Sequence, residues 1–138
     1  MTAADAPAVA LLSAQLGYPL APAVIAERLG SLFQEPAHGC FVAESGGAVT
    51  GWVHIFGVFM LTSPQFFAEI GGLVVDRDAR RQGVGQALMR QAEVWAGEHG
   101  FAEVRLRSGL HRTEAHEFYQ SIGYERAKTS HMFRKAVA

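Results

Sequence analysis

The sequence predicts a mixed α/β fold in which helices flank a central β-sheet, within a single domain of residues 1–138. An apolar segment at 66–76 precedes a charged, glycine-containing turn and an amphipathic helix at 83–98, and another apolar segment follows at 103–107. Because a helix joins the two apolar segments, we expect them to be parallel strands connected by a right-handed crossover. This succession of strand, helix and strand is the pattern that predicts the fold class.

The other elements are predicted from apolar periodicity and from turn residues. Helices are expected where apolar side chains recur at helical spacing, and strands where β-branched and aromatic residues are concentrated. Gly46-Gly47 indicates a hairpin turn, and Gly71-Gly72 indicates a β-bulge or the close approach of a ligand. The expected helices are 5–17, 23–33 and one from Thr113 that Gly123 closes, and the expected strands are 40–44, 49–56 and 125–134.

Composition points to a folded protein with a hydrophobic core. Hydrophobic residues make up 49% of the chain and charged residues 18%, which is typical of globular domains and not of disordered chains. The net charge of −1 gives no support for nucleic-acid binding. The single cysteine, Cys40, excludes an internal disulfide and fits a reducing compartment. Because the chain shows neither the basic stretch of a signal peptide nor an apolar run of membrane-spanning length, we expect a cytoplasmic protein.

The turn before the long helix has the features of an anion-binding site. Gly83 and Gly85 carry no Cβ atom, so a phosphate can approach the main chain closely. The N–H groups of the turn and of the helix N-terminus add partial positive charge, and Arg80 and Arg81 add full charges. The turn is not a P-loop, and it is not a complete G-x-G-x-x-G motif because Leu88 occupies the third glycine position. It does satisfy the pattern [RQ]-x-x-G-x-[GA].

In this pattern the chain resembles the Gcn5-related N-acetyltransferase (GNAT) family, whose pyrophosphate loop binds acetyl-CoA. An ordinary strand-to-helix turn with exposed arginines is the alternative interpretation. The segment 112–124 also resembles the family's C-terminal motif N-x-x-A-x-x-[FL]-Y-x-x-x-G-[FY], although Arg112 stands where the family has asparagine. Because that asparagine usually contacts the pantetheine arm, the contact is left open here. The matching residues are Ala115, Phe118, Tyr119, Gly123 and Tyr124.

The resemblance implies where acetyl-CoA binds. The pantetheine arm is expected to insert between splayed parallel strands and to pair with the backbone of Leu73 and Val75, and a backbone N–H near Val75 is expected to hold the oxyanion. No metal is expected, because the histidines do not show a recognised ligand spacing. The implied cofactor-binding residues are Leu73, Val74, Val75, Arg80, Arg81, Gln82, Gly83, Val84, Gly85 and Gln86.

The resemblance also implies a base and an acid. A primary amine with a reference pKa of about 10.4 must lose a proton before it attacks the thioester. Glu69 lies where histone-type GNAT enzymes have their base glutamate, and Tyr119 matches the family's general acid. Each residue has a structural alternative, because Glu69 could be a solvated residue at the start of a strand and Tyr119 could belong to the apolar face of its helix. Glu44 and His54 are reserve candidates for the base.

The predicted function is transfer of the acetyl group of acetyl-CoA to a primary amine of a small molecule, by direct attack in a ternary complex. The segment from Arg112 to Tyr119 resembles small-molecule amine acetyltransferases, including those of the aminoglycoside type. Two alternatives stay open: a protein N-terminal or lysine acetyltransferase, and a non-catalytic acyl-CoA-binding regulatory domain. No nucleic-acid or membrane partner is expected, and a homodimer is left open.

Overall fold

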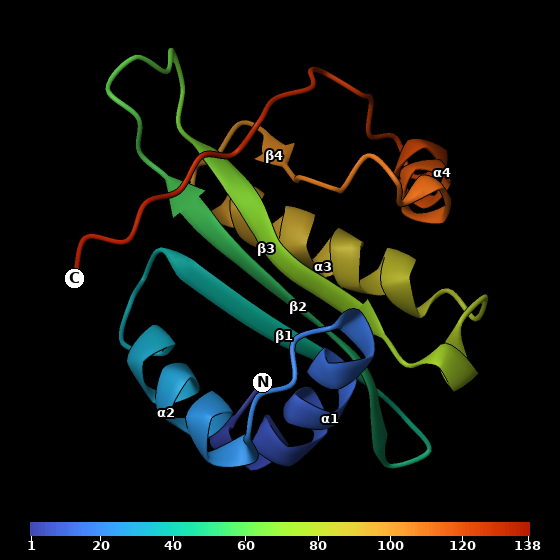
Figure 1. Ribbon diagram of the computed structural model, residues 1–138. Coiled ribbons are helices and arrows are strands. Elements are labelled where there is room, and N and C mark those ends of the chain that lie inside the picture. The colour runs from blue at the N-terminus through green and yellow to red at the C-terminus, as the bar shows by residue number, and fades with distance from the viewer. The chain divides into compact units, whose positions relative to one another are not determined.

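The computed structural model describes residues 1–138, which divide into two compact units, Met1–Arg107 and Ser108–Ala138. The helices and strands of the first unit follow one another in the order that the sequence predicts, and the second unit contains one helix (Figure 1). The elements are the 3-10 helices η1 (Ala3–Asp5) and η2 (Arg77–Ala79), the α-helices α1 (Ala6–Leu16), α2 (Pro22–Leu32), α3 (Val84–Glu98) and α4 (Thr113–Ser121), and the strands β1 (His38–Ser45), β2 (Ala48–Val58), β3 (Phe67–Val75) and β4 (Val104–Arg105).

The first unit is built on a four-stranded sheet in the order β1-β2-β3-β4. β1 pairs with β2 and β2 with β3 in antiparallel fashion, whereas β4 is parallel to β3 because α3 carries the chain back across the sheet. Gly46 and Gly47 join β1 to β2 with φ angles of +59° and +81°. Positive φ at both positions is the geometry of a type I′ hairpin turn, which confirms the predicted turn.

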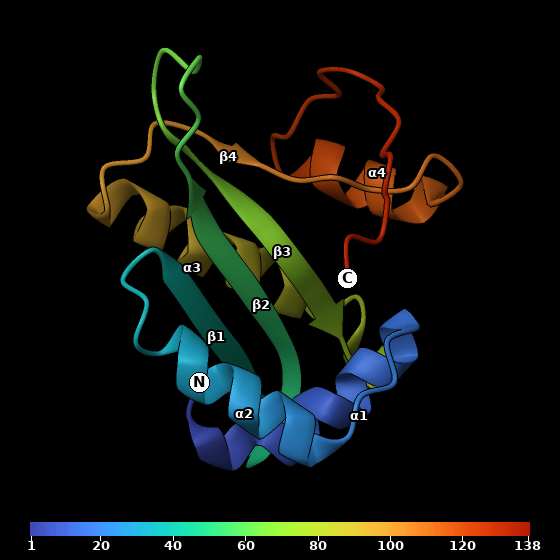
Figure 2. The ribbon, with the colours of Figure 1, turned by 60° about the vertical axis from the view of Figure 1, so that its left-hand side comes forward.

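Helices cover both faces of this sheet. The side chains of Cys40, Val42 and Trp52 pack against the apolar core that α1 and α2 form. On the opposite face, a Cβ atom on Gly51 would meet the side chain of Leu88 on α3 at 2.9 Å, so the helix packs closely on the strand. Figures 1 and 2 show α3 on one side of the strands and α1 and α2 on the other.

A β-bulge interrupts β3 at the predicted glycine pair. His54 is opposite Gly72 and Ile55 is opposite Ile70, so Gly71 has no partner on β2. A Cβ atom on Gly71 would lie 2.7 Å from Nδ1 of His54, closer than packed side chains come. Because these glycines have no side chains, side chains of β2 can lie across β3.

The parallel strands β3 and β4 separate soon after they meet. Only Ala68 and Glu69 of β3 have register partners on β4, which are Val104 and Arg105. The strand β4 is therefore shorter than the predicted 103–107. Beyond Glu69 the backbone of β3 has no β4 partner, which confirms that the parallel strands are splayed.

One prediction for the second unit is wrong. The helix α4 begins at Thr113 as expected, but the segment 125–134 is not a strand, and no regular element follows Ser121. A strand needs both a hydrogen-bonding partner and a face to bury. Met132 and Phe133 of this segment are exposed instead. Taken over both units, no helix combines the length and the apolar character that crossing a membrane requires.

Candidate active site

The loop between β3 and α3 is anchored at its beginning. The side chain of Asp76 accepts a hydrogen bond from the backbone N–H of Asp78 at 3.1 Å, and the backbone N–H of Arg77 donates to Oε1 of Gln15 on α1 at 3.1 Å. Ala79 is buried. The first half of the loop is thus held in place against the first helix, and the second half begins from a defined position.

The second half of the loop leaves space beside its backbone. Arg81 and Gly83 have φ angles of +66° and +80°, and Gly83 is the N-cap residue of α3. A Cβ atom on Gly83 would meet nothing within 4 Å. No side chain caps α3, so the N–H groups of its first turn remain available to an anion. A non-glycine residue with positive φ costs on the order of 1–2 kcal/mol, and such strain concentrates at binding sites.

The loop continues the open edge of β3. Leu73, Val74 and Val75 pair with β2 along one edge, while their other edge has no β4 partner. This edge exposes unpaired N–H and C=O groups of the kind that an extended chain can pair with. The structure therefore brings the predicted strand residues and the predicted phosphate loop into one continuous surface. Arg80, Arg81 and Gln82 are exposed on it.

Glu69 lies on the sheet face opposite α3. Its register partners are Phe56 on β2 and Arg105 on β4, and its side chain is 22% exposed. The carboxylate Oε1 is 3.6 Å from Nε of Arg107. A bound ammonium group would therefore share the Glu69 carboxylate with the guanidinium of Arg107. The sequence analysis did not predict this ion pair.

His54, the reserve candidate, has a partner that the sequence analysis missed. Nε2 of His54 is 2.9 Å from Nδ1 of His38 on β1, so one ring donates a hydrogen bond to the other. Burial lowers the pKa of His54 to about 4, with a smaller contribution from His38. Cys40 is the register partner of His54, and His38 lies two residues before Cys40. Because residues two apart on a strand share a face, this spacing was the only sequence signal for the pair.

Glu44, the other reserve candidate, does not reach this region. It lies near the hairpin turn, where its register partner is Val49. Glu69, in contrast, pairs with Phe56. Since a strand rises about 3.3 Å per residue, Glu44 and Glu69 lie near opposite ends of β2. The structure therefore gives Glu44 no role in a shared site with Glu69.

Tyr119 lies on α4 in the second unit. Its ring meets those of Phe118 and Tyr124 edge to face, at centroid distances of 5.2 and 6.1 Å. Burial raises the pKa of Tyr119, and the charge of Arg112 opposes this rise. The phenol therefore holds its proton at neutral pH. This half-buried position is compatible with both the packing role and the acid role that the sequence suggested.

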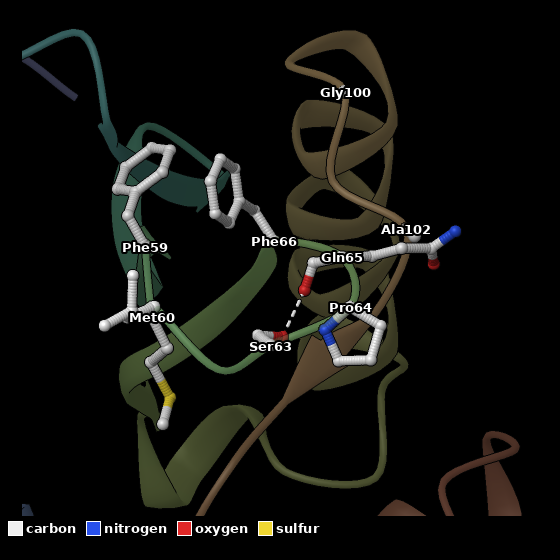
Figure 3. A pocket seen from close by; sticks show the side chains of 9 residues that line it. Phe59, Met60, Ser63, Pro64, Gln65, Phe66, Gly100 and Ala102 are labelled. Carbon is white, nitrogen blue, oxygen red and sulfur yellow. Dashed lines mark hydrogen bonds between the residues drawn. The ribbon is translucent and has the colours of Figure 1, made fainter.

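A separate hollow occurs at the other end of β3 from the phosphate loop (Figure 3). The rings of Phe59 and Phe66 meet there edge to face at 4.9 Å, and the Ser63 hydroxyl donates to the backbone oxygen of Gln65. No charged side chain lines it, so it lacks groups for binding phosphate or for moving a proton. Its lining residues are Phe59, Met60, Leu61, Ser63, Pro64, Gln65, Phe66, Gly100 and Ala102.

Comparison with known proteins decides the family. The model of the acetyltransferase (GNAT) family matches residues 8–124. This chain belongs to that family. Among curated GNAT relatives, N-acetyltransferase family 8 member 2 of Rattus norvegicus is 37% identical over 98 residues, which are 70% of this chain and 42% of the relative. N-acetyltransferase 8 of Homo sapiens is 36% identical over 92 residues, 66% of this chain and 40% of the relative. The chain thus spans less than half the length of these relatives.

Solved structures confirm the GNAT fold. The aminoglycoside 6'-N-acetyltransferase AAC(6')-Ih from Acinetobacter baumannii superimposes with a TM-score of 0.87 at 18% identity, covering 100% of this chain and 96% of its own. AAC(6')-Iy in complex with CoA gives a TM-score of 0.87 at 17% identity, covering 98% of this chain and 91% of its own. At such identities the likeness concerns the fold.

Proposed function

We propose that this chain transfers the acetyl group of acetyl-CoA to a primary amine, and that residues 1–138 act as one acetyltransferase domain. The observation that carries the proposal is that two stretches of backbone with unpaired N–H or C=O groups lie next to each other. The uncapped N-terminus of α3 lies beside the free space at Gly83, and the loop that leads to it leaves the unpaired edge of β3. The family match across 8–124, which extends into both units, supports treating them as one domain.

The residues present fit acetyl-CoA. N–H groups from Arg81 to Gln86 would hold the pyrophosphate, because the helix N-terminus and the nearby guanidinium groups favour negative charge. The free edge of β3 at Leu73–Val75 would pair with the amide groups of the pantetheine arm. When bound, acetyl-CoA supplies an activated acetyl thioester. The backbone N–H of Val75 would then stabilise negative charge that develops on the carbonyl oxygen.

Two side chains are proposed to move protons. The Glu69 carboxylate attracts the ammonium form of the acceptor and takes up its proton, directly or through water, while Arg107 keeps the carboxylate oriented. Tyr119 gives its proton to the leaving sulfur, a role supported by the raised pKa that keeps the phenol protonated. Neither step requires a covalent bond to the protein, so the acetyl group passes straight to the amine.

The proposed acceptor is a small molecule that carries primary amines. The solved neighbours include several aminoglycoside acetyltransferases. One of them, in complex with sisomicin, superimposes with a TM-score of 0.78 at 22% identity, and the match covers 99% of this chain and 93% of that chain. The acceptor side of this chain offers the Glu69 carboxylate on a sheet face that α3 does not cover. A carboxylate there suits a cationic acceptor.

The test is thiol release from acetyl-CoA with three amines: sisomicin, a lysine-containing peptide, and a peptide with an N-terminal alanine. Mass spectrometry identifies any acetylated product, and calorimetry with CoA measures binding independently. Acetylated sisomicin supports the proposal as stated, and an acetylated peptide alone would replace the acceptor class. If CoA binds and no amine is acetylated, the chain is a non-catalytic acyl-CoA-binding domain and the proposed function is wrong.

A further inference from the structure

Two histidines on neighbouring strands form a hydrogen-bonded pair. Nδ1 of His38 on β1 and Nε2 of His54 on β2 are 2.9 Å apart. The rings are stacked, with centroids 5.2 Å apart and planes 16° apart. Phe56 lies against both, at 5.6 Å from His38 and 5.5 Å from His54. Packing on one shared aromatic ring therefore holds the two imidazoles in contact.

A hydrogen bond between two neutral imidazoles has a direction. The inner nitrogen of one ring donates its N–H, and the inner nitrogen of the other accepts with its lone pair. The outer nitrogen of the donating ring then carries a lone pair, and the outer nitrogen of the accepting ring carries an N–H. The pair therefore always presents one outer proton acceptor and one outer proton donor, which are Nδ1 of His54 and Nε2 of His38 in one order or the other.

The bulge in β3 lets the His54 ring lie over the strand that carries Glu69. Nδ1 of His54 lies over Gly71, 2.7 Å from where a Cβ atom would be. Phe56, which touches both imidazoles, is the register partner of Glu69. Nδ1 of His54 thus lies over β3, the strand that carries the proposed base, on the same face of the sheet, while His38 lies one strand further away on β1.

The surroundings disfavour a positive charge on His54. Around it, β1 presents Cys40 opposite His54, with the Met1 amino group 3.4 Å from the Cys40 carbonyl, and α1 and α2 present an apolar core. The strand β3 presents Glu69, which is ion-paired with Arg107. Burial, with a smaller effect of His38, lowers the pKa of His54 to about 4, so the His54 ring is uncharged at neutral pH.

We propose that His54 and His38 are a two-ring proton relay that carries to solvent the second proton of the acceptor amine, the one lost as the nitrogen becomes an amide. The proposal rests on the proposed function. Glu69 takes the first proton of the ammonium group; the second proton, which the nitrogen loses as it becomes an amide, bonds to Nδ1 of His54. At the same time the proton on Nε2 of His54 passes to Nδ1 of His38, and the proton on Nε2 of His38 leaves to water. Each ring gains one proton and loses one, so no charge stays on the pair. Reverse exchange with water restores the starting tautomers before the next turnover.

The first experiment compares pH profiles of acetyl transfer to sisomicin, or to whichever peptide the chain acetylates. His54→Gln should lower kcat by about 10²-fold at neutral pH, the size expected for loss of one proton-transfer group. His38→Gln should lower kcat less and should shift the acidic limb of kcat/KM upward by on the order of one pH unit, because His54 loses the neighbour that helps to lower its pKa. A structural role for His38 would leave that limb where it is.

His99→Gln is the matched control. His99 also stacks on an aromatic ring, that of Trp95 at 4.3 Å, and its Nδ1 is 2.8 Å from the Trp95 carbonyl oxygen. It lies at the end of α3 and outside the pair. Its rate and pH profile should match those of the wild type. A rate within about twofold of wild type for His54→Gln, with an unshifted profile, overturns the relay.

The second experiment needs no activity. Nitrogen-15 NMR of the histidine side chains reads the tautomers in the wild-type chain near neutral pH. We expect a proton on Nε2 of both His38 and His54 and a bare Nδ1 on His54. A proton on Nδ1 of His54 overturns the relay even if the variants fail to fold. A wild-type chain that binds CoA but acetylates no amine overturns the proposed function and the relay with it. A wild-type chain that acetylates an amine but fails the tests of the relay overturns the relay alone.

Discussion

Nδ1 of His54 lies 2.7 Å from the place where Gly71 would carry a Cβ atom. The bulge in β3 leaves Gly71 without a partner on β2, and the His54 ring occupies the space above it. The absence of one side chain on β3 therefore sets the position of a ring on β2. The hydrogen bond from that ring to His38 depends on the same space.

Gly71→Ala should displace His54 and break its contact with His38. The added methyl group would also lie 3.1 Å from the Phe56 ring, so neither ring can remain where it is. Overpacking of this kind costs about 1–3 kcal/mol, and we expect the lower part of that range because side chains rather than backbone must shift. Urea unfolding and the histidine NMR spectrum measure the two effects.

The control for Gly71→Ala is Gly30→Ala in α2. A Cβ atom on Gly30 would meet nothing within 4 Å, and alanine is favoured over glycine inside a helix by roughly 0.5–1 kcal/mol. This variant should be slightly more stable than wild type with an unchanged histidine spectrum. An unshifted His54 signal in Gly71→Ala would contradict the steric argument.

Gly83→Val should abolish CoA binding. The branched side chain would enter the free space beside the loop that we assign to phosphate, and a φ of +80° would strain any L-residue. We expect the CoA affinity to fall by more than about tenfold, equivalent to 1.4 kcal/mol. Calorimetry with CoA measures it. Gly97→Ala, at the far end of α3 and also in open space, should bind CoA as wild type does.

Glu69→Gln should lower kcat and change the acidic limb of the pH–rate profile, with little change in CoA affinity. The amide cannot take up a proton, and it no longer attracts the Arg107 guanidinium or a cationic amine. Steady-state kinetics between pH 6 and pH 9 measure the change. Glu103→Gln, which removes an exposed carboxylate paired with Arg105, is the control and should be neutral. Equal rates for both variants would remove Glu69 from the mechanism.

Tyr119→Phe should lower kcat by roughly 10²-fold or more while the melting temperature changes little. The substitution removes only the hydroxyl and keeps the ring contacts with Phe118 and Tyr124. KM for acetyl-CoA should stay near its wild-type value, because the proton is given only in the transition state. Tyr119→Ala is a poor test, since loss of the ring costs about 3–5 kcal/mol. A kcat within twofold of wild type, with an unchanged pre-steady-state transfer step, would leave Tyr119 a packing role only.

The free energy of unfolding should decrease on acidification through His54. Its pKa falls from an ordinary 6.5 to about 4 on folding, so the unfolded chain binds the extra proton first. The stability from the neutral ring is complete above pH 6.5 and is lost as the pH falls toward 4. Because the ring is partly exposed, we expect a loss on the order of 1–2 kcal/mol. Urea unfolding of wild type and His54→Gln at several pH values should show the larger loss in wild type, and His99→Gln should follow the wild type.

The sequence alone determined the helices, the first three strands, the hairpin turn and the glycine-containing loop before α3. These features follow from local rules: apolar spacing places α1, α2 and α3 within a residue of the predicted ranges, and positive φ at Gly46-Gly47 follows from glycine itself. The motif residues that indicate acetyl-CoA are local as well, because a loop and the helix that follows it are adjacent in the chain.

The tertiary structure decided what depends on register and on partners. Residues 125–134 are predicted as a strand but have no regular structure, because a strand forms only against an edge that hydrogen-bonds to it. Arg107 meets Glu69 because β4 runs parallel beside β3. The contact between His38 and His54 requires both the pairing of β1 with β2 and the bulge at Gly71. A shift of one residue in either register would turn one ring to the other face of the sheet, and no local pattern in the sequence encodes that choice.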